Sequence, residues 1–224
     1  MAIYDPVDRD RAILWARNVI ENKDRYLICD TETTGLKEND EVIQIAIINL
    51  NKDILLNTLV KPTWKQSISR DASSIHGIKK KDLDHSPIFR EISDQIHALC
   101  IDKTVIIFNS AFDLRLMEQS NNKGYYPAFI PKHECAMLQY SKFIGTWNDY
   151  RNDYKWQRLS GGDHSALGDC FATLSVLERM THGKTRYFHS LTDDPKLITK
   201  KPEALKIESI NHIEKKNKWW QFWN

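Results

Sequence analysis

The sequence of 224 residues predicts an α/β protein in which helices pack on both faces of one mixed central sheet. Three short apolar segments rich in β-branched residues follow one another in the first part of the chain, with only polar turns between the last two. Farther along, strand patterns alternate with helical patterns. Strands joined by turns run antiparallel and strands joined through helices run parallel, so we expect three antiparallel strands followed by parallel ones.

The first part of the chain is expected to contribute one helix and three strands. Apolar residues recur at helical spacing over residues 8–22, which predicts an amphipathic helix. Residues 26–30 form a short apolar strand, and residues 42–50 are almost continuously apolar, as in a central strand. The polar segment Asn51-Lys52-Asp53 then leads into a third strand over residues 54–60, and this spacing favours an antiparallel hairpin or meander.

The rest of the chain alternates between helices and one further strand. Pro87 opens a helix that runs to about residue 99, with Ser86 as its N-terminal cap. The remaining elements are a fourth strand over residues 104–108 and helices from about residue 111, over 134–143 and over 165–180.

Composition indicates a soluble globular protein, with 41% hydrophobic and 28% charged residues. The net charge of +2 does not point to nucleic acid by itself, although a local positive patch can lie beside an acidic pocket. No segment approaches the ~20 apolar residues of a membrane span, and the N-terminus lacks the apolar core of a secretory signal. The four cysteines form no CxxC pair, which is typical of small buried residues in a reducing compartment. We therefore expect a cytoplasmic protein.

Residues 1–190 are expected to form one folded domain, and residues 191–224 a charged C-terminal tail. The tail is rich in Lys and Glu and ends in the aromatic cluster Lys218-Trp-Trp-Gln-Phe-Trp-Asn224. Large aromatic side chains are rarely left as an exposed patch. Three interpretations stay open: the tail packs on this protein or on a second copy, it docks another protein, or it lies at a membrane interface.

Asp30 and Glu32 are the most informative residues of the chain. They follow an apolar strand and, two positions apart, project from the same face of it. Two acids side by side at the end of a buried strand repel each other and cost desolvation energy unless a cation lies between them. The structural alternative is that Asp30 caps a turn and Glu32 is solvated.

A second acidic site occurs in the segment Asn109-Ser-Ala-Phe-Asp113, where a predicted strand ends and a helix begins. Ser110 and Asp113 also have the spacing of a capping box, and an acid at this position favours the helix dipole. A purely structural role for Asp113 therefore stays open.

A third site is His164-Ser-Ala-Leu-Gly-Asp169. Five residues apart on a continuous helix, two side chains lie on different faces. For both to reach one pocket, His164 should lie on the loop before the helix, where Gly161 and Gly162 allow movement. A surface His beside an exposed Asp is the structural alternative.

Taken in order, these segments resemble the DEDDh group of 3′–5′ exonucleases, which share a ribonuclease H-like fold. Asp30-Thr-Glu-Thr-Thr-Gly-Leu36 matches the first motif, and the segments ending at Asp113 and Asp169 resemble the second and third. Ile75-His76-Gly77-Ile78 resembles a characteristic linker segment. The resemblance covers roughly residues 26–180. Phe108 and Cys170 depart from the common residues of the group, but neither change removes a catalytic group.

The resemblance implies a two-metal hydrolysis of phosphodiesters. Hard carboxylate oxygens suit Mg²⁺ or Mn²⁺, and two such ions roughly 4 Å apart can hold the attacking and leaving oxygens in line. Asp30, bridging, would hold the pair with Glu32 and Asp169, and Asp113 would contact one ion directly or through water. His164, with an ordinary pKa near ~6.5, would take the proton from the attacking water.

Four further residues are candidates for substrate binding. Thr33, on the opposite strand face from Glu32, would present its backbone to the terminal nucleotide. The resemblance places His76, Asn109 and Phe112 on the substrate side, with Phe112 stacking on a base. Core packing is an equal alternative for Phe112.

We therefore predict a metal-dependent 3′–5′ exonuclease that releases nucleoside monophosphates from 3′ ends, with single-stranded nucleic acid as its expected partner. The first motif differs from that of oligoribonucleases, which favours DNA over RNA. The alternatives are a polymerase-associated proofreading subunit, an RNA-processing 3′–5′ exoribonuclease, and a non-catalytic subunit that binds nucleic acid or a partner. Retention of all five catalytic residue types argues against the last. The basic run Lys79-Lys80-Lys81 contacts phosphates or is simply a solvated surface.

Overall fold

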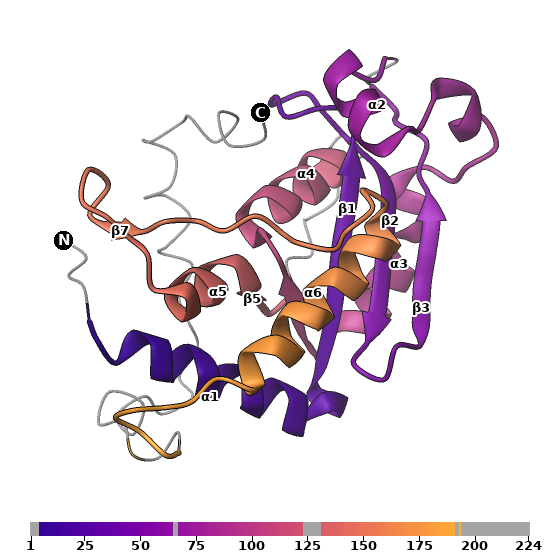
Figure 1. Ribbon diagram of the computed structural model, residues 1–224. Helices are drawn as coiled ribbons and strands as arrows, with labels where there is room; N and C mark the ends of the chain where they lie inside the picture. The colour runs from indigo at the N-terminus through magenta and orange to yellow at the C-terminus, as the bar shows by residue number, and fades with distance from the viewer. Residues whose placement is uncertain (1–4, 65–66, 123–130, 191–192, 194–224) are drawn as a thin grey trace.

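A five-stranded mixed sheet lies at the centre of the protein (Figure 1). The computed structural model describes residues 5–64, 67–122, 131–190 and 193. In spatial order the strands are β3 (Ile54–Leu59), β2 (Val42–Asn49), β1 (Tyr26–Thr33), β4 (Thr104–Ile107) and β5 (His133–Cys135). β1 pairs antiparallel with β2 and β2 antiparallel with β3, whereas β1 and β4, and β4 and β5, are parallel. The predicted fold class is confirmed.

Helices cover both faces of the sheet, and each face has its own hydrophobic core. The helices are α1 (Asp8–Glu21), α2 (Arg70–His76), α3 (Phe89–Cys100), α4 (Ser110–Asn122), α5 (Ala136–Ile144) and α6 (Ala166–Thr181), with short 3₁₀ turns at η1 (Lys23–Arg25) and η2 (Lys80–Leu83). α1, α5 and α6 share one core with Ile28 of β1, and α3 and α4 share the other with Leu27 and Cys29. Successive strand residues point to opposite faces, so β1 is buried on both sides.

The predicted cap of α3 is wrong. The helix begins at Phe89, its N-cap residue is Ile88, and the Glu91 side chain accepts a hydrogen bond from the Ile88 N–H at 3.0 Å. Ile88 is instead extended and forms a bridge with Lys61, whose N–H donates to the Pro87 carbonyl at 2.8 Å. The helix therefore begins later in the chain than Pro87 indicates, because the residue before it pairs with the segment after β3.

Short elements account for the other differences. The helix expected over residues 134–143 begins at Ala136, because the residues before it form the edge strand β5. The short helix α2 and the hairpin of β6 (Trp147–Asn148) and β7 (Asp153–Tyr154) were not expected. Elements of two to seven residues are too short for hydrophobic periodicity to identify.

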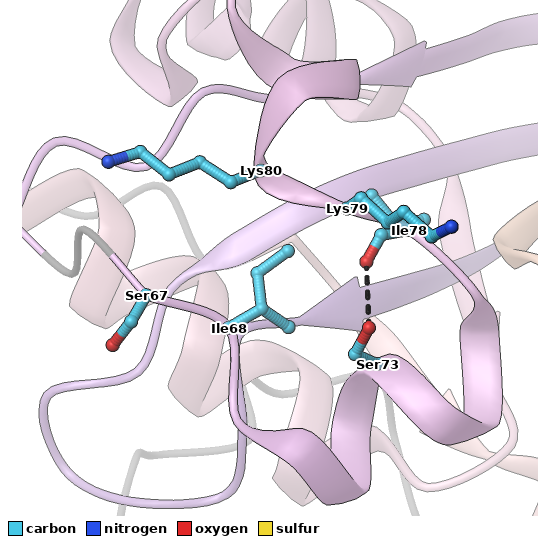
Figure 2. Close-up of a pocket in the computed structure, with 6 residues that line it drawn as sticks. All are labelled: Ser67, Ile68, Ser73, Ile78, Lys79 and Lys80. Atoms are coloured by element: carbon cyan, nitrogen blue, oxygen red, sulfur yellow. Dashed lines mark hydrogen bonds between the residues drawn. The ribbon is translucent and has the colours of Figure 1, made fainter.

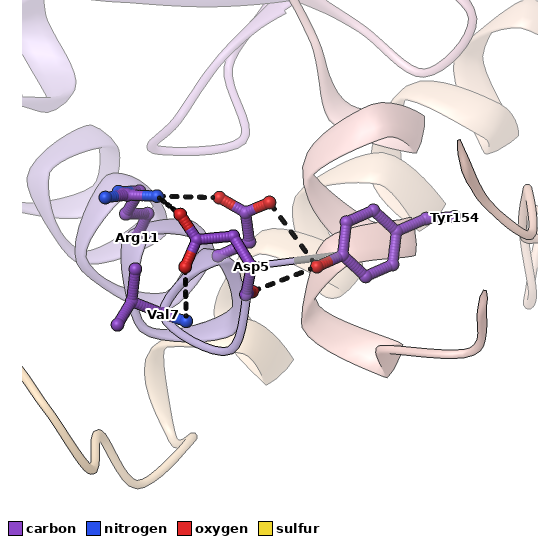
Figure 3. Close-up of polar contacts among 5 residues, drawn as sticks. Asp5, Val7, Arg11 and Tyr154 are labelled. Atoms are coloured by element: carbon purple, nitrogen blue, oxygen red, sulfur yellow. Dashed lines mark hydrogen bonds and ion pairs between the residues drawn. The ribbon is translucent and has the colours of Figure 1, made fainter. Parts of the chain in front are cut away.

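The hairpin is tied to the start of α1 by polar contacts (Figure 3). The Tyr154 hydroxyl lies 3.2 Å from the Asp5 carbonyl oxygen and 3.4 Å from an Asp8 carboxylate oxygen. Arg11 pairs with both acids, at 2.7 Å and 2.9 Å. These contacts fix β7. Residues 155–163 then connect β7 to His164.

All four cysteines are unpaired, as predicted, and three of them are buried. Among the described residues, no helix is both long and apolar enough to cross a bilayer. The predicted tail, apart from Asp193, lies outside the described residues.

Candidate active site

Two of the predicted acids lie together at the end of β1. The burial pattern alternates along the strand: Asp30 and Glu32 are partly buried, whereas Thr31 and Thr33 are fully buried on the other face. The register with β2 shifts between Glu32 and Thr33, so the regular ladder ends just after the second acid. The predicted shared face of the two carboxylates is therefore present.

Asp169 joins these two residues from the first turn of α6. One carboxylate oxygen each from Asp30, Glu32 and Asp169 lie within 4.8 Å of one another. The helix begins here because the Ser165 hydroxyl accepts from the Gly168 N–H at 3.0 Å, as an N-cap does. Gln44 of β2 is directly opposite Glu32, and its side-chain oxygen accepts from the Ala166 N–H at 3.1 Å, which holds the helix start against the sheet.

The loop before α6 passes very close to these carboxylates. A Cβ atom on Gly162 would collide with the Asp169 carboxylate, and one on Gly168 would collide with Asp163. Asp163 in turn accepts from the Ser165 N–H at 3.0 Å and from its hydroxyl at 2.7 Å. Gly162 was expected to allow movement of the loop, and its role in close approach to Asp169 was not predicted. The sequence signal for this close approach is that one glycine, Gly162, comes directly before Asp163 and another, Gly168, comes directly before Asp169.

Asp113 lies behind the three-carboxylate group. It is 3% exposed, and its Oδ1 accepts from both the N–H and the hydroxyl of Thr31, at 3.1 Å and 2.7 Å. Ser110 is the first residue of α4, and this Asp113 oxygen points to the sheet. The side chain is therefore attached to β1 and is not one of the three grouped carboxylates, although its charge raises the pKa of Asp30.

Burial raises the pKa values of all four acids, and the charges of the neighbouring acids raise those of Asp30, Glu32 and Asp113 further. Burial raises the pKa of Asp30 well above its ordinary value, and the charge of Asp113 raises it further. Burial and the charge of Asp169 raise the pKa of Glu32 to about 8. Burial raises the pKa of Asp113 to about 7, although hydrogen bonds from Thr31 lower it, and burial also raises the pKa of Asp169.

This donor set fits a divalent cation. Among the described residues, no Lys or Arg side chain forms an ion pair with any of the four acids. A hard cation would supply the missing positive charge and would release the protons that the raised pKa values retain. Asp30, Glu32 and Asp169 would hold it, with Asp113 next to them.

His164 lies on the loop before α6, where the sequence argument placed it. Its side chain is exposed, and its backbone has φ = 61°. The His164 N–H lies 3.3 Å from Oδ1 of Asp169, so its backbone is attached to one of the acids. The imidazole is not among the three-carboxylate group.

The candidate substrate residues surround the same strand end. Thr33 is 6% exposed, and its hydroxyl donates to the Gly35 carbonyl at 2.8 Å. Both nitrogens of His76 contact backbone: Nδ1 accepts from the Ile78 N–H at 3.0 Å, so Nε2, which lies 3.2 Å from the Thr33 carbonyl oxygen, must carry the proton. Burial lowers the pKa of this imidazole.

Asn109 and Phe112 lie at the start of α4. The Asn109 carbonyl accepts from the Phe112 N–H at 2.9 Å, and both side chains are partly buried. Phe112 packs against the core under α3 and α4, and the Arg115 guanidinium lies 5.6 Å from its ring centre. Core packing is thus observed for Phe112, and stacking on a base stays a prediction.

The fold and the site together define a class of protein. A mixed sheet flanked by helices, with carboxylates converging at the end of β1 and the start of α6, is the arrangement of a nuclease with a ribonuclease H-like fold. The family model RNase_T, described as Exonuclease, matches residues 27–177. The chain therefore belongs to this exonuclease family.

Two relatives agree with this assignment. An exonuclease of Escherichia phage 186, named CP81 and described as uncharacterized, is 31% identical over 200 residues, which is 82% of this chain and 98% of the relative. The DNA polymerase III subunit epsilon of Buchnera aphidicola subsp. Schizaphis graminum is 31% identical over 223 residues, which is 88% of this chain and 95% of that protein.

Escherichia coli Exonuclease I, solved in complex with an oligonucleotide, superimposes with a TM-score of 0.52 and 18% identity. The match covers 70% of this chain but only 40% of that one, and it shows likeness of fold. The predicted exonuclease family, the ribonuclease H-like fold and the enzyme class of exonuclease are confirmed.

Proposed function

We propose that this protein is a metal-dependent 3′–5′ exonuclease that removes nucleoside monophosphates from single-stranded 3′ ends, with DNA favoured over RNA. The observation that carries the proposal is the group of Asp30, Glu32 and Asp169, whose oxygens lie within 4.8 Å of one another. A protein gains no stability from three converging acids, so their positions are explained best by a cation.

Each residue of the site has a part in the proposed reaction. Two ions, Mg²⁺ or Mn²⁺, would supply positive charge on both sides of the scissile phosphate. Asp30 and Glu32 are fixed by β1, and Asp169 is fixed by the capped start of α6, so the donor oxygens are positioned in advance. Thr31 orients Asp113.

His164 is the proposed general base. It is exposed and attached through its backbone to Asp169, so its imidazole can face the water that attacks the phosphorus. The water gives its proton to the imidazole as its oxygen bonds to phosphorus, and the bond from phosphorus to the 3′ oxygen of the preceding nucleotide breaks. That oxygen leaves with the electron pair and takes a proton from solvent to become the new 3′ hydroxyl. The product is a nucleoside 5′-monophosphate and a strand shorter by one nucleotide.

A gel assay tests this proposal. DNA and RNA strands of the same sequence, labelled at the 5′ end, are incubated with the protein in Mg²⁺ or in EDTA. We expect a ladder of products shortened from the 3′ end, with DNA degraded faster, in Mg²⁺ only. Release of the labelled 5′ nucleotide first, or equal degradation in EDTA, would refute the proposal. Faster degradation of RNA would favour the exoribonuclease alternative.

The similarity to polymerase epsilon subunits supports a second candidate, which is proofreading in a complex with a polymerase. In that case the protein would act on mismatched 3′ ends presented by its partner. Co-purification with a polymerase would distinguish this candidate from a free-standing nuclease. The predicted contact of the C-terminal tail with another protein belongs to this candidate. We also propose a cytoplasmic location, which the four unpaired thiols support.

A further inference from the structure

Trp64 is an exposed aromatic residue at the same end of the sheet as the carboxylates. Its side chain is 67% exposed, whereas large aromatic side chains are usually well buried. It follows β3 at the end where Leu59 pairs with Gln44, and Gln44 pairs with Glu32. Neighbouring strands lie about 4.8 Å apart, so the end of β3 is about 10 Å from the strand that carries Asp30 and Glu32.

A buried carboxylate fixes the backbone of this residue. Glu41 is 2% exposed; its Oε2 accepts from the Trp64 N–H at 2.9 Å, and its Oε1 accepts from the N–H and hydroxyl of Thr63 at 3.0 Å and 2.9 Å. The Glu41 carbonyl in turn accepts from the N–H of Thr34, two residues after Glu32, at 2.9 Å. The indole is therefore displayed from a backbone that is attached to the active-site strand.

A cleft of about 320 Å³ lies next along the chain (Figure 2). The Ser69 N–H donates to the Thr34 carbonyl at 2.8 Å, and His76 Nε2 contacts the Thr33 carbonyl, so both ends of α2 are attached to the end of β1. The cleft and the backbone of Trp64 are thus both attached, through hydrogen bonds, to the residues at the end of β1. The cleft is lined by Ser67, Ile68, Ser73, Ile78, Lys79 and Lys80.

Two exposed lysines border this cleft. In Figure 2 the ammonium groups of Lys79 and Lys80 point away from each other, an arrangement that suits two separate phosphates better than one. In the part of the chain that the structure describes, neither lysine takes part in an ion pair. Trp64 is three residues before Ser67, so their Cα atoms are at most about 11 Å apart.

We propose that Trp64, Lys79 and Lys80 form a binding surface for the substrate strand upstream of the scissile phosphate. This inference rests on the proposed function. The indole stacks on a base and the two ammonium groups contact phosphates, which is the combination of stacking and charge that binds single strands without reading sequence. At about 3.4 Å per stacked nucleotide, the end of β3 is about three nucleotides from the strand that carries Asp30 and Glu32, and Trp64 follows that end of β3.

Charge distinguishes this occupant from the chain's own aromatic tail. The tail carries Lys215, Lys216 and Lys218 beside its tryptophans. Like charges facing Lys79 and Lys80 would oppose its docking there, whereas a polyanionic strand is attracted.

Strand affinity of the full chain tests the inference without relying on cleavage. Asp30→Asn protein serves as the background, and binding of dT3 and dT20 is measured by fluorescence anisotropy with Trp64→Ala or Tyr150→Ala added. Tyr150 is 97% exposed on the hairpin turn and is the matched control. We expect Trp64→Ala to weaken dT20 binding about tenfold, with dT3 binding unchanged and Tyr150→Ala without effect.

The lysines have their own readout. The Lys79→Gln/Lys80→Gln variant should reduce the slope of log affinity against log salt by about 1.4, since each phosphate contact on a single strand contributes about 0.7. Equal behaviour of Trp64→Ala and Tyr150→Ala on dT20, or an unchanged salt slope, would overturn the inference. The inference would also be overturned if Trp64→Ala left dT20 affinity unchanged and only converted a dimer into a monomer in sedimentation. Lack of cleavage by the unmutated protein would refute the proposed function but would leave these affinities to decide the surface.

Discussion

Thr31 donates two hydrogen bonds to the same oxygen of Asp113, from its N–H at 3.1 Å and from its hydroxyl at 2.7 Å. Thr31 stands between Asp30 and Glu32 and points to the opposite face of β1. One strand therefore presents two acids on one face and orients a third on the other. This arrangement explains why the residue between the two acids is a buried hydroxyl residue.

Replacement of Thr31 by Val should reduce turnover about tenfold, because a hydrogen bond to a charged group contributes about 1.5–3 kcal/mol and its loss leaves Asp113 poorly oriented. The hydrogen bonds from Thr31 lower the pKa of Asp113, so the acidic limb of the pH–rate profile should move to higher pH. The measurement is kcat from pH 6 to 9. Thr31→Ser is the control and should resemble the unmutated protein; identical profiles for Val and Ser would contradict the assigned role.

The metal-free protein should lose stability as pH rises. Glu32 has an ordinary pKa of 4.5 and a folded-state pKa of about 8, so the folded state binds more protons than the unfolded state between these values. Its contribution to the free energy of unfolding is therefore present below pH 4.5 and lost as pH rises through about 8. Asp30→Asn removes a neighbouring charge and should melt at a higher temperature than the unmutated protein in EDTA at pH 8.

Added Mg²⁺ should reverse this order by stabilising only the protein with all four acids, by about 2.7 kcal/mol at 100 times its dissociation constant. Melting curves in EDTA and in Mg²⁺ give the comparison. The control is Asp94→Asn, because Asp94 is an exposed residue of α3. A lower melting temperature for Asp30→Asn than for Asp94→Asn in EDTA would show that the acids do not repel one another.

Gly162→Ala should impair catalysis more than folding. The added Cβ collides with the Asp169 carboxylate, so the group of three oxygens must separate. Gly161→Ala is the matched control, since its Cβ meets open space and the cost is only that of its φ of 90°, about 1 kcal/mol. We expect kcat to fall at least tenfold for Gly162→Ala and little for Gly161→Ala. Equal kcat values for the two variants would refute the close-approach argument.

His164→Ala should slow single-turnover cleavage by about 10²–10⁴-fold, the usual contribution of a general base. Strand affinity and metal affinity should stay unchanged, because the imidazole acts on the water. His182→Ala, at the other end of α6, is the control. A parallel loss of metal affinity would make His164 a ligand, and an unchanged rate would remove it from the mechanism.

Asp10 of α1 should hold the segment that follows α6 against the folded domain. It is 2% exposed, and its Oδ2 accepts from the backbone N–H groups of Arg186, Tyr187 and Phe188. Asp10→Ala would leave these donors without their acceptor and should cost about 1–3 kcal/mol of stability and open the segment to proteases. Urea unfolding and limited proteolysis measure both effects. Unchanged protection of residues 184–190 would refute this docking role.

The sequence was sufficient for the sheet and for the identity of the acids. Strand β2 is long, apolar and β-branched, and it lies centrally between β1 and β3, as its pattern predicts. Asp30 and Glu32 share a face because side chains alternate along any strand. These properties depend on local periodicity, which a single sequence contains.

Contacts between distant segments could not be predicted in the same way. The start of α3 depends on Lys61 pairing beside Pro87, and the start of α6 depends on Gln44 reaching Ala166. The link between Asp113 and Thr31 spans 82 residues. No local pattern reports which distant residue will arrive, so caps and orienting partners were the parts that sequence reasoning missed.

Whether the carboxylates at the end of β1 hold a catalytic cation is decided by single-turnover removal of the 3′-terminal nucleotide in Mg²⁺, measured for Asp30→Asn beside Asp94→Asn. Asn keeps the shape of the side chain but removes the charge that holds a divalent cation. We expect Asp30→Asn to cleave no faster than the no-enzyme control while keeping its fold by circular dichroism, and Asp94→Asn to cleave at the unmutated rate. Cleavage by Asp30→Asn at the unmutated rate would show that these carboxylates do not hold a catalytic cation.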